Sequence, residues 1–175
     1  MRIVTGKYKG RKVKSPEDKG THPMGEREKL ALFNMLGNDL SGVVVLDAYA
    51  GSGALGIEAL SRNAKKVVFV EKSPKVTWVI RENLKNIAPD DDYEVFCKDI
   101  AKFSEEYEGK FDLIIADPPY DHFEIKEVEK LIKVLKSGGI LVLSYPKDEK
   151  IEFLGLKLQK NRNYAASGIA IFEKV

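Results

Sequence analysis

The sequence contains a single cysteine, Cys97, so no disulfide can form within the chain. Its two histidines, His22 and His122, are far apart in the sequence, which argues against a zinc site built from clustered Cys and His ligands. Cys97 lies in an apolar run that is typical of a strand, and we expect its thiol to be buried in the core. We therefore predict a function that requires no metal ion.

The sequence also lacks any apolar run close to the length that crosses a bilayer, and its N-terminus lacks the apolar segment of a signal peptide. A cytoplasmic protein without a membrane partner is therefore predicted. The 175 residues are 43% hydrophobic and 32% charged, which is ordinary for a globular chain with one substantial core. We expect a monomer.

Acidic residues are absent from the first 14 positions, although the whole chain has a net charge of only +2. The basic residues of this segment are Arg2, Lys7, Lys9, Arg11, Lys12 and Lys14. The run from Gly6 to Lys12 predicts the tip of a hairpin between short strands at 1–5 and 11–13. Lysine and arginine neutralise phosphates and Tyr8 can stack on an unpaired base, so this arm favours RNA binding. A solvated, lysine-rich surface turn is the alternative.

The stretch around which the remaining chain is organised is VVVLDAYAGSGALG, residues 43–56. An apolar strand ends at Asp47, and a glycine-rich turn then opens into a helix that begins near Leu55. Gly51 and Gly53 let the backbone pass close to a ligand, which is typical of a site for a nucleoside. The run GSGALG also matches the dinucleotide-binding fingerprint, so both interpretations remain open at this point.

Strands and helices alternate beyond this element, which predicts an α/β fold with a mainly parallel sheet covered on both faces. Strands are expected at 66–71, 93–97, 111–116 and 140–143, and helices at 26–36, 76–87 and 128–135. The segments 151–159 and 168–173 predict a closing antiparallel hairpin that turns through Asn161, Asn163 and Ser167. We expect a basic N-terminal arm, residues 1–24, followed by one domain, residues 25–175.

Four carboxylates follow the predicted strands, and ligands bind beyond the carboxyl ends of such strands. They are Asp47, Glu71, Asp99 and Asp117. The spacing of Glu71 from the glycines suits an acceptor for both ribose hydroxyls, although it is also compatible with a surface acid. Asp99 suits an acceptor from an adenine amine, with Ile100 packed on the ring, or alternatively the N-cap of a short helix.

The stretch Asp117-Pro118-Pro119-Tyr120 distinguishes the possible chemistries. Two prolines stiffen the loop and fix the direction of its carbonyls. A planar base stacked on Tyr120 would have its exocyclic amine between the Asp117 carboxylate and the Pro118 carbonyl, which both accept hydrogen bonds. Two such acceptors free the nitrogen lone pair for attack and stabilise the positive charge that develops there.

These motifs resemble those of amino-methyltransferases that use S-adenosylmethionine, and more narrowly the ribosomal RNA small-subunit methyltransferase D family. The resemblance rests on DAYAGSGALG at 47–56 together with the Asp-Pro-Pro-Tyr loop, and it extends to MRIV at 1–4, KGRK at 9–12, LFN at 32–34 and GIEALSR at 56–62. It implies a Rossmann-like class I methyltransferase fold with a seven-stranded sheet. It also implies methylation of guanine N2 in 16S rRNA, as naked RNA or within a small-subunit assembly intermediate.

The resemblance assigns roles at matching positions. Cofactor contacts are expected from Asp47, Tyr49, Gly51, Gly53, Glu71, Asp99 and Ile100; catalysis from Asp117, Pro118, Pro119 and Tyr120; RNA contacts from Lys7, Tyr8, Lys9, Arg11, Lys12 and Arg27. The chain departs from the family pattern at 23–30, where PMGER replaces Pro-Thr-Thr-Asp-Arg and Lys29-Leu30 replaces Arg-Glu. An adenine-N6 methyltransferase, a nicotinamide-dependent oxidoreductase and a non-catalytic RNA-binding protein are the alternatives.

Overall fold

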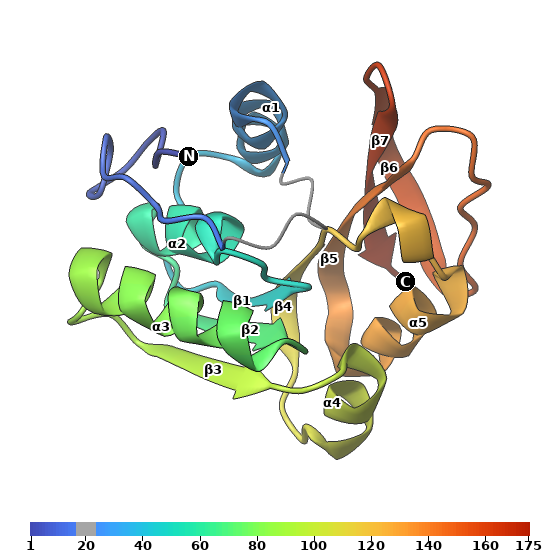
Figure 1. Cartoon of the computed structure of the whole chain (residues 1–175). Helices are drawn as coiled ribbons and strands as arrows, with labels where there is room; N and C mark the ends of the chain where they lie inside the picture. The colour runs from blue at the N-terminus through green and yellow to red at the C-terminus, as the bar shows by residue number, and fades with distance from the viewer. Residues whose placement is uncertain (17–23) are drawn as a thin grey trace.

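The computed structural model describes residues 1–16 and 24–175 and contains a seven-stranded sheet of order β3-β2-β1-β4-β5-β7-β6 (Figure 1). The strands are β1 Val44–Ala48, β2 Lys66–Glu71, β3 Tyr93–Cys97, β4 Phe111–Ala116, β5 Leu135–Pro146, β6 Leu156–Asn163 and β7 Ser167–Lys174. Strands β1 to β5 pair in parallel, and β7 runs antiparallel to both of its neighbours. The predicted α/β sheet with a closing antiparallel hairpin is confirmed.

The order of the strands reverses at β1, which lies between β2 and β4. The carboxyl ends of these three strands meet at one edge of the sheet, because Ala48 is in register with Val70 on one side and Ala116 on the other. A ligand crevice is expected at such a reversal point, since the loops that follow the strands diverge there.

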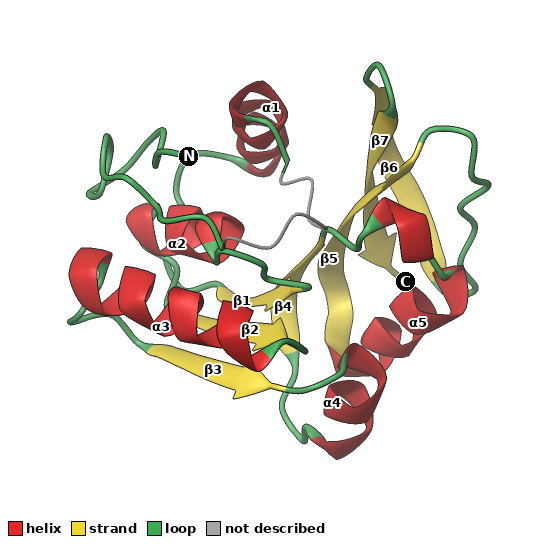
Figure 2. Cartoon of the chain, viewed as in Figure 1, coloured by secondary structure: helices red, strands yellow, loops and turns green. Residues whose placement is uncertain are grey.

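Helices cover both faces of the sheet, as the alternating strand residues require (Figure 2). They are α1 Glu26–Leu36, α2 Ala54–Ser61, α3 Pro74–Ile87, α4 Ile100–Glu106 and α5 Ile125–Lys130, with short 3-10 helices η1 Tyr120–His122 and η2 Leu131–Val134. Val45 and Val67 face the core shared with α1, α2 and α3. Their neighbours Leu46 and Val68 face the core shared with α4, α5 and η2.

The N-terminal arm packs tightly against α2 and does not form the predicted pair of strands. Only one isolated bridge, Arg2 with Lys12, is formed within residues 1–16. The backbone N–H groups of Val4 and Thr5 donate instead to the two carboxylate oxygens of Glu58 on α2, at 2.9 and 3.0 Å. The Thr5 N–H is therefore unavailable to a β-ladder, and pairing across the arm is limited to a few bonds around Ile3, whose N–H donates to the Arg11 carbonyl at 3.0 Å. The expected strands are therefore wrong, while the hairpin-like path of the arm is kept.

Glu58 is also the centre of a fully buried ion cluster. The Lys29 ammonium lies 3.4 Å from its carboxylate, and the Arg62 guanidinium donates to it at 3.2 Å. Lys29 also donates to the Arg2 carbonyl at 2.6 Å, so the cluster joins α1, α2 and the arm. Burial lowers the pKa of Lys29, although the neighbouring Glu58 carboxylate opposes that shift. Lys29, at the position where the chain departs from the family pattern, therefore has a structural role.

Two further predictions need correction. Residues 151–155 are not a strand, because β6 begins at Leu156; Phe153 instead turns inward and packs edge-on against Phe172 of β7. Cys97 is exposed rather than buried, because it is the last residue of β3, which forms the open edge of the sheet. Trp78 is 62% exposed on α3, whereas Tyr145 is buried in the core.

None of the helices within 1–16 and 24–175 has both the length and the apolar character needed to cross a membrane. Over the same residues, no cluster of three or more His, Cys, Asp or Glu side chains is placed to hold a metal ion. His22 lies outside the described residues.

Candidate active site

The glycine-rich loop after β1 is held in shape from inside the fold. Gly51 and Gly53 both have positive φ, and Gly53 is the left-handed N-cap of α2. Gly56 packs so closely on β2 that a β-carbon there would lie 2.2 Å from a ring carbon of Phe69. These glycines therefore serve both the turn and the contact between helix and sheet.

Asp47 supports this loop from beneath. Its carboxylate is 1% exposed and accepts a hydrogen bond from the Gly56 N–H at 2.8 Å. The other oxygen, Oδ1, has no hydrogen-bond partner among the described residues. Burial raises the pKa of the Asp47 carboxyl well above its usual value. Neither Asp47 nor Gly53 lines the cavity described next, so the positions of these two residues do not support the direct cofactor contacts predicted for them.

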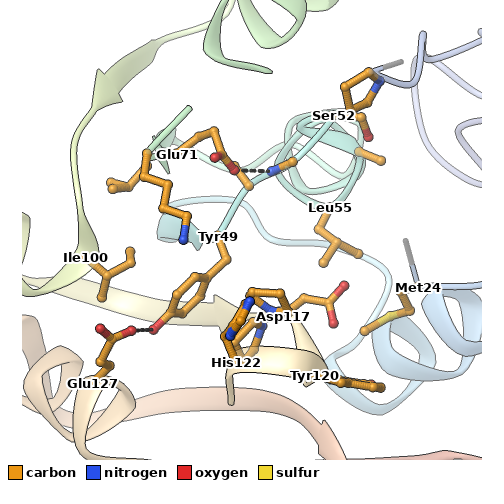
Figure 3. A pocket seen from close by; sticks show the side chains of 18 of the residues that line it. Met24, Tyr49, Ser52, Leu55, Glu71, Ile100, Asp117, Tyr120, His122 and Glu127 are labelled. Atoms are coloured by element: carbon orange, nitrogen blue, oxygen red, sulfur yellow. Dashed lines mark hydrogen bonds between the residues drawn. The ribbon is translucent and has the colours of Figure 1, made fainter. Parts of the chain in front are cut away.

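A cavity of about 460 Å³ opens at the carboxyl ends of β1, β2 and β4 (Figure 3). It lies where the reversal of strand order predicts a ligand site. Nine of the eleven residues predicted for cofactor binding and catalysis line it, and they come from the ends of four different strands. They are Tyr49, Gly51, Glu71, Asp99, Ile100, Asp117, Pro118, Pro119 and Tyr120. The structure therefore brings five of the seven predicted cofactor residues and the predicted catalytic loop to one place.

Glu71 bridges the two loops that begin the cavity. One carboxylate oxygen accepts from the Gly51 N–H at 3.1 Å (Figure 3). The other accepts from the Ser73 N–H at 2.9 Å. Asp99 has the alternative role considered for it, the N-cap of α4, and its role toward an adenine stays a prediction. Its Oδ1 caps α4 by accepting from the Ala101 N–H at 2.8 Å, and the residue also lines the cavity.

Tyr49 crosses the cavity from the glycine loop to α5. It is one of two non-glycine residues with positive φ within the described chain, at 59°. Its hydroxyl lies 3.5 Å from the Glu127 carboxylate (Figure 3). Backbone strain of this kind persists where the surroundings fix a functional geometry. The contact to Glu127 was not predicted, since nothing in the sequence relates α5 to the first strand.

The Asp-Pro-Pro-Tyr loop forms the opposite wall of the cavity. The Tyr120 hydroxyl shares a hydrogen bond of 2.5 Å with the Ser144 hydroxyl near the end of β5. Burial raises the pKa of the Asp117 carboxyl to about 6, the Ser144 hydroxyl opposes this shift, and the negative charge of Glu28 reinforces it. Asp117 is thus ionised at neutral pH but close enough to its pKa to respond to mild acid.

Ser144 and Met24 belong to this wall but were not predicted from the sequence. Ser144 ends the apolar stretch of β5, so the rule that placed the other site residues at strand ends could have found it. Met24 lines the cavity from the segment that departs from the family pattern, immediately before α1. Figure 3 shows Met24 beside Tyr120, and it therefore shapes the side of the cavity where a target base is expected.

The predicted RNA-binding residues lie outside the cavity. Lys7 and Tyr8 both contact Asp91, through an ion pair at 2.5 Å and a hydrogen bond at 2.8 Å, and Arg11 donates to the Asn86 carbonyl. Three others, Lys9, Lys12 and Arg27, are exposed. The arm is therefore fixed on the α3 side of the molecule, and its RNA binding stays a prediction.

The strand order, the glycine loop and the Asp-Pro-Pro-Tyr wall define a class I methyltransferase of Rossmann-like fold. The solved structure of "putative methylase HI0767" from Haemophilus influenzae superposes with a TM-score of 0.83 at 27% identity, covering 99% of this chain and 98% of that one. The family model described as "Conserved hypothetical protein 95" matches residues 1–173. The chain belongs to that family.

Two curated relatives extend this comparison. "Putative rRNA methyltransferase YlbH" of Bacillus subtilis is 32% identical over 182 residues, which cover 99% of both chains. "Ribosomal RNA small subunit methyltransferase D" of Haemophilus influenzae is 37% identical over 130 residues, covering 73% of this chain and 67% of the relative. The family resemblance inferred from the motifs is therefore confirmed.

Proposed function

We propose that this protein transfers a methyl group from S-adenosylmethionine to the exocyclic N2 amine of a guanine in 16S ribosomal RNA. The observation that carries the proposal is the position of Asp117, which faces one cavity together with Gly51 and Glu71. The proposed acceptor for the amine, Asp117, and the proposed nucleoside site at Gly51 and Glu71 therefore line the same cavity. The names of the two relatives, both ribosomal RNA methyltransferases, support ribosomal RNA as the substrate class.

The cavity fits the cofactor in size and in chemistry. Its volume of about 460 Å³ lies within the range for small-molecule sites, roughly 300–1,000 Å³. The Glu71 carboxylate is suited to accept from ribose hydroxyls, and Asp99 and Ile100 are suited to the amine and the face of an adenine. Bound S-adenosylmethionine would supply an electrophilic methyl group. The glycine backbone of the loop leaves room for the adjacent amino-acid part.

The catalytic work of the protein falls on the opposite wall. Asp117 and the Pro118 carbonyl would accept hydrogen bonds from the target amine, orient its lone pair and stabilise the positive charge that develops on nitrogen. Tyr120, held by Ser144, would support the face of the base. The base must first leave its stack, which costs a few kcal/mol and least at an unpaired nucleotide, so a loop or junction is the favoured target.

The proposal is tested by incubating the protein with labelled S-adenosylmethionine and either naked 16S rRNA or small subunits, followed by nuclease digestion and mass spectrometry of the nucleosides. N2-methylguanosine is the expected product. N6-methyladenosine would instead establish the adenine alternative. If the protein binds the cofactor but the RNA acquires no label, RNA methylation is contradicted.

The pH dependence of the reaction follows from Asp117. Only the ionised carboxylate accepts hydrogen bonds with both oxygens, and its pKa of about 6 lies above the ordinary value of 3.8. We therefore expect kcat/KM to be constant near pH 8 and to fall about tenfold per unit below pH 6. Cofactor affinity, measured by calorimetry at the same pH values, is the control. A flat rate profile from pH 5 to 8 would contradict the assigned role.

Glu71 is expected to control cofactor affinity. Glu71→Ala removes both the proposed ribose acceptor and the support of the Gly51 and Ser73 N–H groups. The dissociation constant for S-adenosylmethionine should rise roughly tenfold to a hundredfold, the effect of lost hydrogen bonds to a charged group. Glu129→Ala, an exposed acid on α5, is the matched control. Equal affinity in both variants would remove Glu71 from the cofactor site.

A further inference from the structure

The most exposed large aromatic residue of the described chain is Trp78, the only tryptophan in the sequence. It lies on the outer face of α3 with 62% of its surface exposed. The residues one and two turns away on that face, Lys75, Arg81 and Lys85, are also exposed. The single acid of α3 is Glu82, which is half-buried. The indole therefore contributes little to the core, and it is accessible to a ligand on a face where the neighbouring side chains are cationic.

We name this face the α3 strip, and define it as Lys72, Lys75, Trp78, Arg81 and Lys85. It connects the two regions already described. Lys72, at its start, lines the cavity. At its far end, the N-terminal arm contacts α3 through Arg11, which donates to the Asn86 carbonyl, and the two elements lie side by side in Figure 1. The 14 residues of α3 span about 20 Å between cavity and arm.

We propose that the α3 strip binds the single-stranded RNA that flanks the target guanine, with one unpaired base stacked on the Trp78 indole and phosphates on Lys75 and Lys85. The inference rests on the proposed RNA methyl transfer and adds the path of the substrate. Stacking on an isolated aromatic between cations is the mode by which proteins hold single strands.

The composition of the strip favours RNA over a protein partner. Protein interfaces have a core of several apolar residues from which charges are depleted. Among the described residues, α3 presents one large exposed apolar side chain, and cations flank it along the helix. This arrangement complements a polyanion that carries one planar apolar group per phosphate.

The single tryptophan makes a direct test possible with the unmodified protein. Titration with an unstructured RNA oligonucleotide should quench the Trp78 fluorescence saturably, with a midpoint that weakens as salt rises. S-adenosylhomocysteine alone should leave the emission unchanged, because the cavity does not include Trp78. Unchanged fluorescence at RNA concentrations where the anisotropy of a labelled oligonucleotide shows binding would overturn the inference.

Variants extend the test to catalysis. Trp78→Ala should raise KM for the RNA substrate roughly fivefold to a hundredfold, the range for loss of one base stack, and leave kcat and cofactor affinity unchanged. Trp78→Phe should restore most of the affinity. Lys75→Ala should reduce the slope of log affinity against log salt by about 0.7. Leu154→Ala, which alters another exposed apolar residue, is the control.

The two levels of the proposal fail separately. If the wild-type protein yields no methylated nucleoside from ribosomal RNA, the proposed function is wrong. If it methylates RNA but Trp78→Ala has the KM of the wild type, only the role of the α3 strip is wrong. Circular dichroism establishes that the variant is folded, as expected for a side chain so exposed.

Discussion

Asp117→Ala is expected to lower the rate of methyl transfer by roughly a hundredfold to a thousandfold and to leave cofactor affinity unchanged. A charged acceptor that is aligned with the developing positive charge contributes most in the transition state, and its removal has effects of that size. The residue faces the cavity from the wall opposite Glu71, so cofactor contacts on the glycine side are retained. Single-turnover kinetics with saturating cofactor measure the loss.

The Asp117 variant should remain folded, which makes the loss of rate interpretable. In the wild-type protein, the pKa of the Asp117 carboxyl is raised to about 6, so the ionised carboxylate destabilises the fold at neutral pH. This cost appears as pH rises from about 3.8 to about 6, and alanine removes it. The melting temperature of the variant is therefore expected to equal or exceed that of the wild type.

Two further variants sharpen this test. Asp117→Asn keeps one carbonyl acceptor without the charge, so its rate should lie between those of the alanine variant and the wild type. Asp148→Ala makes the same chemical change on an exposed turn and should have no effect. A wild-type rate for Asp117→Ala, with normal cofactor binding, would show that the amine is activated by another group.

The sheet and its site could be predicted from the sequence because both depend on local signals. The strands at 66–71, 93–97 and 111–116 begin and end where the apolar runs predict. Parallel pairing then brings the residues after each strand to one edge, so chain order alone places Glu71, Asp99 and Asp117 together.

The features that were missed depend on contacts between distant segments. The arm was expected to form strands, yet the N–H groups of Val4 and Thr5 donate to Glu58, more than fifty residues away. Asp47 ends its strand as predicted, but its side chain turns under the loop toward Gly56 instead of into the cavity. Cys97 looks like a core residue until the strand order places β3 at the edge of the sheet. Tertiary position decides each of these cases.

Glu58 carries the second large expected effect, because one carboxylate fixes three parts of the fold. It accepts from the arm backbone, pairs with Lys29 of α1 and pairs with Arg62 at the end of α2. The Arg62 guanidinium also lies 4.7 Å from the Phe33 ring centroid, so it cannot leave easily for water. Both cations would remain buried without their counter-charge if Glu58 were neutralised.

Glu58→Gln is therefore expected to lower the free energy of unfolding by about 3–5 kcal/mol, the cost of breaking a buried pair by removing one partner. For a domain of this size, the melting temperature should fall by roughly 10 °C. Glu106→Gln, which breaks the exposed pair with Lys98, is the matched control and should change stability by less than about 1 kcal/mol. Faster hydrogen exchange at Val4 and Thr5 should accompany the loss, because one amide oxygen cannot replace two carboxylate oxygens as acceptor. If the glutamine variant is as stable as the wild type, neither the charge of Glu58 nor its second acceptor oxygen contributes to the stability of the fold.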